Sequence, residues 1–133
     1  MATKIELFTL HKYFLNASLM KHELDLILKN PTADKNSSNP NVWSYISLWY
    51  GCLRVVIEGW KDLNLTDPLV DPLLIDEKIT LLNGFRNDTF HFKPDYVSKR
   101  SIALLDDKDF VKWIRDLHDP LGHSILVQLK AAK

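Results

Sequence analysis

Apolar residues recur at intervals of three and four positions along most of this chain, which is the period of helices that bury one face. Over Lys4–Lys29 the pattern runs among Lys, His and Glu residues with no interrupting glycine or proline, and it predicts a long first helix. The pair Asn30-Pro31 ends this helix, and the polar segment Asp34–Asn41 predicts a surface loop after it.

A second helix is predicted from Asn41, its N-cap, to about Leu63. Apolar side chains surround nearly its whole circumference, so we expect neighbouring elements to cover it on nearly all sides. Its polar positions form one strip with helical spacing: Ser44, Ser47, Gly51, Arg54, Glu58 and Lys61. The strip is either a solvent-exposed edge with a favourable Arg54–Glu58 pair, or one wall of a cleft in which Glu58 orients a guanidinium.

The third helix is predicted as Leu73–Phe92. Asp71 and Pro72 precede it as an N-cap and a first-position proline, and Pro94 disfavours helical geometry beyond its end. After Pro94 the pattern is ambiguous until an acidic cluster, Asp106–Asp109, which suits a helix N-terminus.

Apolar residues from Phe110 to Leu121 predict a fourth helix, in which Pro120 is expected to cause a kink or a break. No alternating run is long enough to predict a sheet, and no repeat divides the chain. The 133 residues, 46% of them apolar, suffice for one domain with one core. We therefore expect an all-α, up-and-down bundle of four to five helices that spans residues 1–133.

The charge is balanced, with 17 Lys and Arg residues against 17 Asp and Glu residues, so no whole-molecule field attracts nucleic acid; a local basic cleft is the alternative. The single cysteine, Cys52, lies among apolar residues and predicts a buried thiol in a reducing compartment. The N-terminal segment lacks the apolar block of a signal peptide, and no segment approaches the about 20 apolar residues of a membrane span. The sequence thus predicts a cytoplasmic protein.

Polar residues gather in the last turns of the predicted third helix. At about 100° per residue, Arg86 and His91 lie roughly 140° apart on the helix, with Asn87 between them. Asn83 and Gly84 fall in the same sector, and a glycine inside a helix indicates that a backbone, a helix or a ligand comes close. This sector is a candidate contact surface. The simpler alternative is a helix end with a dipole-matched histidine and a solvated arginine.

Residues 86–91 read Arg-Asn-Asp-Thr-Phe-His, which resembles the Arg-polar-x-x-x-His signature of the HEPN superfamily. Members of that superfamily are small domains of four to five helices that often act as metal-independent ribonucleases. The resemblance covers roughly Trp43 to Trp113, because the motif closes the third helix and follows a Trp-rich second helix that carries Glu58-Gly59-Trp60.

The resemblance implies that the motif Arg and His of two protomers meet across a homodimer cleft, with neither a metal ion nor a cofactor. His91 would deprotonate the RNA 2′-hydroxyl or protonate the leaving 5′-oxygen, and Arg86 would stabilise charge on the phosphate. Asn87 would hold either group in place, and the product would be a 2′,3′-cyclic phosphate. The supporting residues in this hypothesis are Glu58, Arg54 and Asn83.

One HEPN subgroup has a Tyr two residues after the motif His, where this chain has Phe92-Lys93. That departure argues against a toxin that a partner nucleotidyltransferase modifies. A second hypothesis is therefore a catalytically silent, HEPN-like dimeric module that binds or scaffolds an unknown partner. The balanced charge and the missing Tyr favour this module, whereas the intact Arg86, Asn87 and His91 favour the ribonuclease.

The remaining candidates are weaker. His118 and His123 lack the spacing of a zinc site and are expected at the surface. The Trp residues of the second helix favour core or dimer packing over base stacking. Gly51 and Gly84 are the positions at which we expect a dimer interface through the second and third helices.

Overall fold

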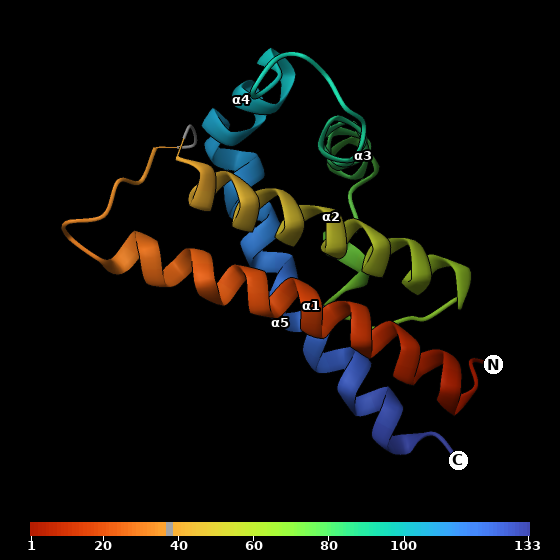
Figure 1. Ribbon diagram of the computed structural model, residues 1–133. Helices are drawn as coiled ribbons and strands as arrows, with labels where there is room; N and C mark the ends of the chain where they lie inside the picture. The colour runs from red at the N-terminus through yellow and green to blue at the C-terminus, as the bar shows by residue number, and fades with distance from the viewer. Residues whose placement is uncertain (37–38) are drawn as a thin grey trace.

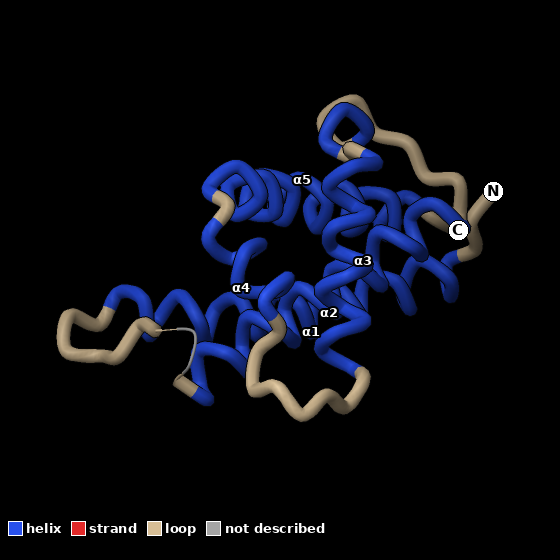
Figure 2. Tube along the Cα trace, turned by 90° about the horizontal axis from the view of Figure 1, so that it is seen from above, coloured by secondary structure: helices blue, strands red, loops and turns tan. Residues whose placement is uncertain are grey.

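The computed structural model describes residues 1–36 and 39–133, and in these ranges all regular structure is helical (Figure 1). The elements are α1 (Lys4–Lys29), α2 (Pro40–Asp62), the short 3-10 helix η1 (Asp71–Leu73), α3 (Asp76–Phe90), α4 (Lys99–Asp106) and α5 (Lys108–Ala131). Figure 2 shows only helices and loops along the described chain. The predicted all-α helical bundle is confirmed.

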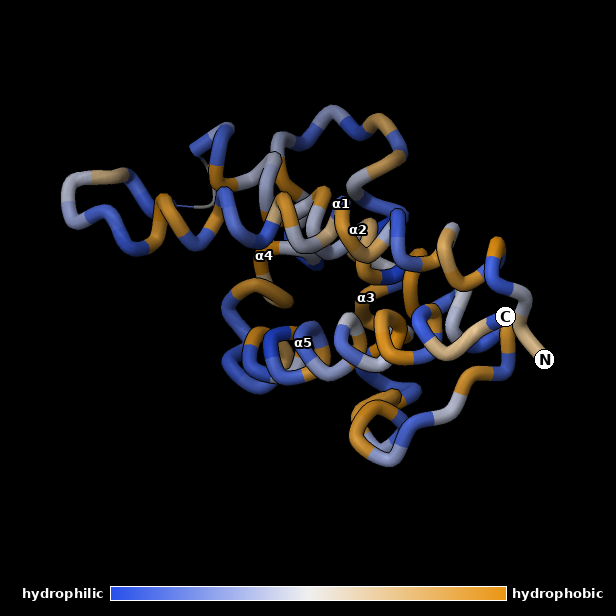
Figure 3. Tube along the Cα trace, turned by 90° about the horizontal axis from the view of Figure 1, so that it is seen from below, coloured by the Kyte–Doolittle hydropathy of each residue, from blue (hydrophilic) through white to orange (hydrophobic). Residues whose placement is uncertain are grey.

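The helix α2 lies between α1 on one side and α3 on the other. Its chain direction opposes that of α1, and α5 crosses behind this pair while packing on α1 and α4 (Figure 1). The two termini lie at the same end of the molecule in all three views. Apolar and polar residues follow one another along the helices (Figure 3), as expected where each helix buries one face.

The bounds of α1 match the prediction, because Thr3 and Glu6 form a capping box at its start. The predicted start of α2 was two residues late: Asn39 is the N-cap, and its side chain accepts a hydrogen bond from the backbone N–H of Asn41. Pro40 then occupies the first helical position, where its missing N–H costs nothing. Of the predicted loop Asp34–Asn41, residues 37 and 38 lie outside the described part.

The predicted start of α3 at Leu73 was wrong. Pro72 opens only η1, and the backbone of Leu74 leaves the helical region at ψ 75°. The indole N–H of Trp113 donates to the carbonyl of Leu73 at 2.7 Å, so that carbonyl serves tertiary packing. The helix α3 therefore begins at Asp76 and ends at Phe90, with His91 as its extended C-cap.

The C-terminal third contains a helix that the periodicity did not predict and a proline that does not break its helix. In α4, Ser98 caps the N-terminus by accepting from the backbone N–H of Ser101. In α5 the helix continues through Pro120. The carbonyl deprived of its partner belongs to Asp116, which is exposed, so water can satisfy it.

The core gathers around α2, as its apolar circumference predicted. Its largest fully buried side chains include Trp49, Tyr50, Trp60, Phe85 and Phe110. Trp43, on the same helix, is half-buried and lies against Phe85 with ring centroids 5.6 Å apart. The Trp residues of α2 therefore contribute to packing within one chain.

His118 is part of this core, and the prediction of a surface position was wrong. Only 3% of the residue is exposed. The indole N–H of Trp49 donates to its Nδ1 at 3.0 Å, and its Nε2 lies 3.1 Å from Ser18 Oγ. Because Nδ1 accepts, the neutral ring carries its proton on Nε2 and donates to the Ser18 hydroxyl. The ring thus joins α1, α2 and α5.

None of the described helices is long and apolar enough to cross a membrane. In the described part of the chain, no group of three or more His, Cys, Asp or Glu side chains is placed to hold a metal ion. Cys52 is half-buried beside the core, and burial raises the pKa of its thiol.

Candidate functional site

The polar strip of α2 lies partly against α3 and partly in solvent. In its middle, Gly51 is covered by Phe90 so closely that a Cβ at Gly51 would lie 2.7 Å from the Phe90 ring. Towards its C-terminal end Glu58 and Lys61 are exposed, and Lys61 forms an ion pair with Asp76 at 3.6 Å. Each of the two interpretations of the strip therefore holds for part of it. The close contact at Gly51, which was expected in a dimer interface, is made within one chain.

Arg54 lies in the interface between α2 and α3. Its Nε donates a hydrogen bond to the side-chain oxygen of Asn83, so these two predicted supporting residues are in direct contact. Its Nη1 is buried, with no hydrogen-bond partner among the described residues. Burial lowers the pKa of the Arg54 guanidinium, and the nearby carboxylate of Glu58 opposes that shift. Arg54 is thus fixed to α3 through Asn83 and is placed to support α3.

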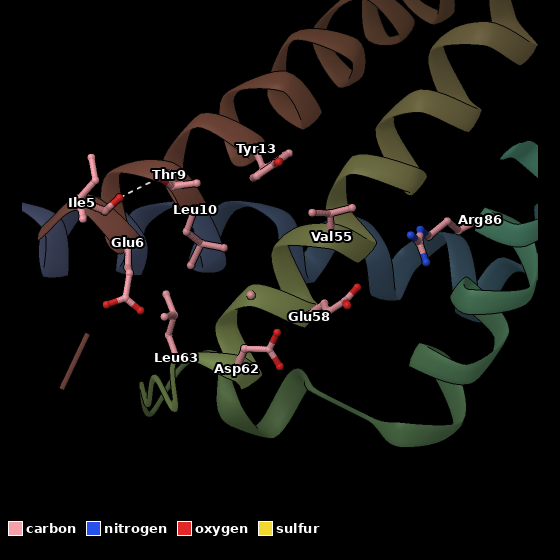
Figure 4. A pocket seen from close by; sticks show the side chains of 11 residues that line it. Ile5, Glu6, Thr9, Leu10, Tyr13, Val55, Glu58, Asp62, Leu63 and Arg86 are labelled. Carbon is pink, nitrogen blue, oxygen red and sulfur yellow. Dashed lines mark hydrogen bonds between the residues drawn. The ribbon is translucent and has the colours of Figure 1, made fainter. Parts of the chain in front are cut away.

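Arg86 extends from α3 into a pocket that it shares with Glu58 (Figure 4). This Arg86 pocket is a cavity of about 530 Å³ between α1, α2 and α3. Glu58 lines the same pocket as Arg86, but no ion pair joins Arg86 to a carboxylate in the described part of the chain. The acidic side chains that line the pocket are Glu6, Glu58 and Asp62.

His91 lies at the C-terminal end of α3, exposed to solvent. Its Nδ1 is 2.8 Å from the backbone carbonyl oxygen of Asn87. A carbonyl can only accept, so Nδ1–H is the donor, and the neutral ring presents the lone pair of Nε2. The backbone carbonyl of residue 87 therefore orients the imidazole, and the holding role predicted for Asn87 itself stays a prediction.

Within one chain, Arg86 and His91 do not line the same pocket. His91 borders a smaller cavity of about 190 Å³ between the end of α3 and the segment 92–101. This separation agrees with the wide angle between the two residues on the helical wheel. Gly84, like Gly51, is covered from within the chain, since a Cβ there would lie 3.1 Å from Arg100 Cζ. The homodimer stays a prediction.

Asp88, in the middle of the motif, has a structural role that the sequence analysis missed. Its side chain is only 5% exposed and accepts from Arg100 Nη2 at 2.8 Å, Lys93 Nζ at 2.6 Å and Ser98 Oγ at 2.8 Å. The hydrogen bond from Arg100 is the main reason why the pKa of the Asp88 carboxyl lies well below its usual range. Asp88 thereby anchors the start of α4, and the segment after His91, to α3.

Replacing Asp88 by alanine is expected to lower the free energy of unfolding by about 1.5–3 kcal/mol, because several charge-assisted hydrogen bonds to one carboxylate are lost. The matched control is Asp95→Ala: Asp95 is exposed in the same connecting segment, so its loss is expected to change stability by at most about 0.5 kcal/mol. Denaturant unfolding followed by circular dichroism measures both. Equal effects would show that Asp88 anchors nothing.

Together these features describe a small all-α domain whose third helix presents one oriented histidine to solvent and one half-buried arginine to a neighbouring pocket. No protein-family model, no curated protein and no solved structure matches the chain. The assignment of function therefore depends on the site.

Proposed function

We propose that this chain is a HEPN-type domain that cleaves RNA without a metal ion, in a homodimer whose cleft joins Arg86 and His91 of two copies. We place it in the cytoplasm, with a role in defence, in stress or as a toxin. The observation that carries the proposal is His91: an exposed imidazole, held by the Asn87 carbonyl, with the lone pair of Nε2 available in the neutral ring.

In the proposed reaction, Nε2 of one neutral His91 removes the proton of the RNA 2′-hydroxyl. The 2′-oxygen then attacks the adjacent phosphorus and the bond from phosphorus to the 5′-oxygen breaks. The leaving 5′-oxygen takes a proton from a water molecule, and the protonated His91 afterwards returns its proton to solvent. The products are a 2′,3′-cyclic phosphate and a free 5′-hydroxyl, so protons and electrons balance without an added reagent.

Arg86 would stabilise the negative charge that develops on the non-bridging phosphate oxygens. Support comes from its guanidinium, which has no ion-pair partner among the described residues and can therefore give its donors to a phosphate. Glu58 lines the same pocket and would orient the guanidinium. Arg54 and Asn83 would hold α3 in place behind it.

The proposed cleft needs two copies because the two motif residues border different pockets of one chain. The surface around His91 supports such an interface. Phe90 is 56% exposed and Phe92 is 97% exposed, so two large apolar side chains flank the histidine in solvent. A second copy would cover them.

A catalytically silent binding module is the second candidate, and the acidic lining of the Arg86 pocket favours it. Three carboxylates, on Glu6, Glu58 and Asp62, share the pocket with one guanidinium. That balance is negative, which opposes the entry of a phosphodiester and suits a cationic group of a partner.

The test is incubation of purified protein with a defined RNA in EDTA, beside the same RNA with single 2′-deoxy substitutions. The ribonuclease cuts the all-ribose strand and fails wherever the nucleotide on the 5′ side of the bond lacks its 2′-hydroxyl. Cleavage that ignores the deoxy substitution contradicts the proposed reaction. Absence of cleavage over varied RNAs favours the binding module.

A further inference from the structure

The outer face of α1 carries a row of large apolar side chains that no part of the described fold covers. Their residue exposures run from 51% at Leu26 to 69% at Ile5. The row consists of Ile5, Phe8, Leu15, Leu19 and Leu26. The residues of α1 that enter the core are on the opposite side of the helix: Leu7, Leu10, Phe14, Ala17 and Leu24. The outer row is therefore not needed for packing within the chain.

The spacing of this row is that of a coiled coil. Intervals of three and four alternate without a break through Ile5, Phe8, Lys12, Leu15, Leu19, His22 and Leu26, and we call these seven residues the α1 seam. Lys12 and His22 are also exposed. At 1.5 Å per residue the seam is about 33 Å long, which gives three heptads of contact.

We propose that the α1 seam forms an antiparallel, two-stranded coiled coil with the α1 seam of a second copy. In the register that fits best, Leu15 lies opposite Leu19 of the second copy, and Phe8 lies opposite Leu26. Lys12 then lies opposite His22. In the inner layers apolar side chains meet apolar ones and the two polar layers meet each other, while Ile5 at the end of the seam lies opposite Lys29 of the second copy. The inner part of the face is thus complementary to itself.

Charge fixes the direction of the pair. In a parallel pair Lys12 would lie against Lys12 of the second copy, which places like charges at one layer of the seam. The antiparallel pair separates the two lysines and brings each beside Glu23 of the other copy, one position after His22. The helix dipoles also favour opposite directions. A second copy in antiparallel orientation thus satisfies both the apolar and the charged positions.

This interface meets the Arg86 pocket only at Ile5, which also lines that pocket, whereas the other seam residues do not line it and Arg86 and His91 are on α3. The inference does not depend on a ribonuclease activity. It requires only that the chain associates through α1, so oligomeric state can be measured without any RNA.

The first test is sedimentation velocity of the full chain over a micromolar concentration range. The wild type is expected to gain mass by association as its concentration rises. Leu15→Glu and Leu19→Lys are expected to lose the association step made through the α1 seam and to keep at most the association made through the proposed cleft, with unchanged helical circular dichroism. Leu69→Glu is the matched control, because Leu69 is 70% exposed outside the seam, and it is expected to dimerise like the wild type. A monomeric wild type, or a dimer unaffected by both seam variants, overturns the proposal.

The second test is a charge exchange that reports the direction of the helices. In the antiparallel register, an equal mixture of Leu15→Glu and Leu19→Lys regains the dimer, because the introduced carboxylate of one chain faces the introduced ammonium of the other. The double variant Leu15→Glu/Leu19→Lys regains it as well. In a parallel pair, neither the mixture nor the double variant aligns opposite charges. Failure of both to dimerise overturns the antiparallel arrangement.

Discussion

His91→Ala is expected to lower the rate of RNA cleavage by about 10²–10⁴-fold, the usual contribution of a positioned acid or base. Arg86→Ala is expected to lower it by about 10²–10³-fold, because the developing charge on the phosphate loses its main donor. Both effects belong to the chemical step, so they should appear in kcat. Initial rates on a fluorescent RNA in EDTA, at saturating RNA, measure them.

Three controls make this result specific. His123→Ala removes another exposed histidine, on α5, and is expected to keep full activity. Arg86→Lys keeps the charge but loses the planar fork of donors, so only partial activity is expected. Circular dichroism must show that every variant is folded. If His91→Ala cleaves as fast as the wild type, the motif is not the catalytic site.

The second large effect concerns stability and comes from His118. Burial lowers the pKa of its imidazole from 6.5 to about 4 in the folded chain. Between these values the unfolded chain binds a proton that the folded chain does not, so stability falls as the pH falls. At about 1.4 kcal/mol per pKa unit, the loss from above pH 6.5 to pH 4 is about 3 kcal/mol.

Denaturant unfolding at pH values from 7.5 to 4.5 (roughly the window set by these two pKa values) measures this loss. The control is His118→Gln, whose amide can accept from Trp49 and donate to Ser18 but does not titrate. We expect its stability to vary much less over this range. Parallel curves for wild type and His118→Gln would contradict the assigned role of His118.

Asp88 depends on pH in a different range. Because the pKa of its carboxyl is lowered in the folded chain, its stabilisation is present above about pH 4 and is lost as the pH falls below that value.

The long helices could be predicted because apolar periodicity is strong where a helix buries a continuous stripe. The bounds of α1 agree with the pattern, and the apolar circumference of α2 correctly indicated its central position. The start of α3 could not be found this way, since the carbonyl of Leu73 bonds to Trp113, 40 positions away. The helix α4 has eight residues, too few for a clear period.

The candidate site was predicted in part. Helical spacing brought Arg54, Glu58, Asn83 and Arg86 to one interface, because residues three and four apart share a face. The role of Asp88 was missed, since its partners Ser98 and Arg100 are on a helix that the pattern did not reveal. His118 was misplaced for a similar reason: a histidine bonded on both nitrogens in a core has no sequence signature.

The most direct test of a cleft shared by two copies is to mix the two inactive variants, His91→Ala and Arg86→Ala, in EDTA and to measure RNA cleavage. A mixed dimer contains one Arg86 and one His91 on opposite copies, so the mixture is expected to regain a substantial fraction of wild-type activity and to yield 2′,3′-cyclic phosphate ends. A mixture as inactive as either variant, from an active wild type and with mixed dimers confirmed by sedimentation, would contradict the shared cleft.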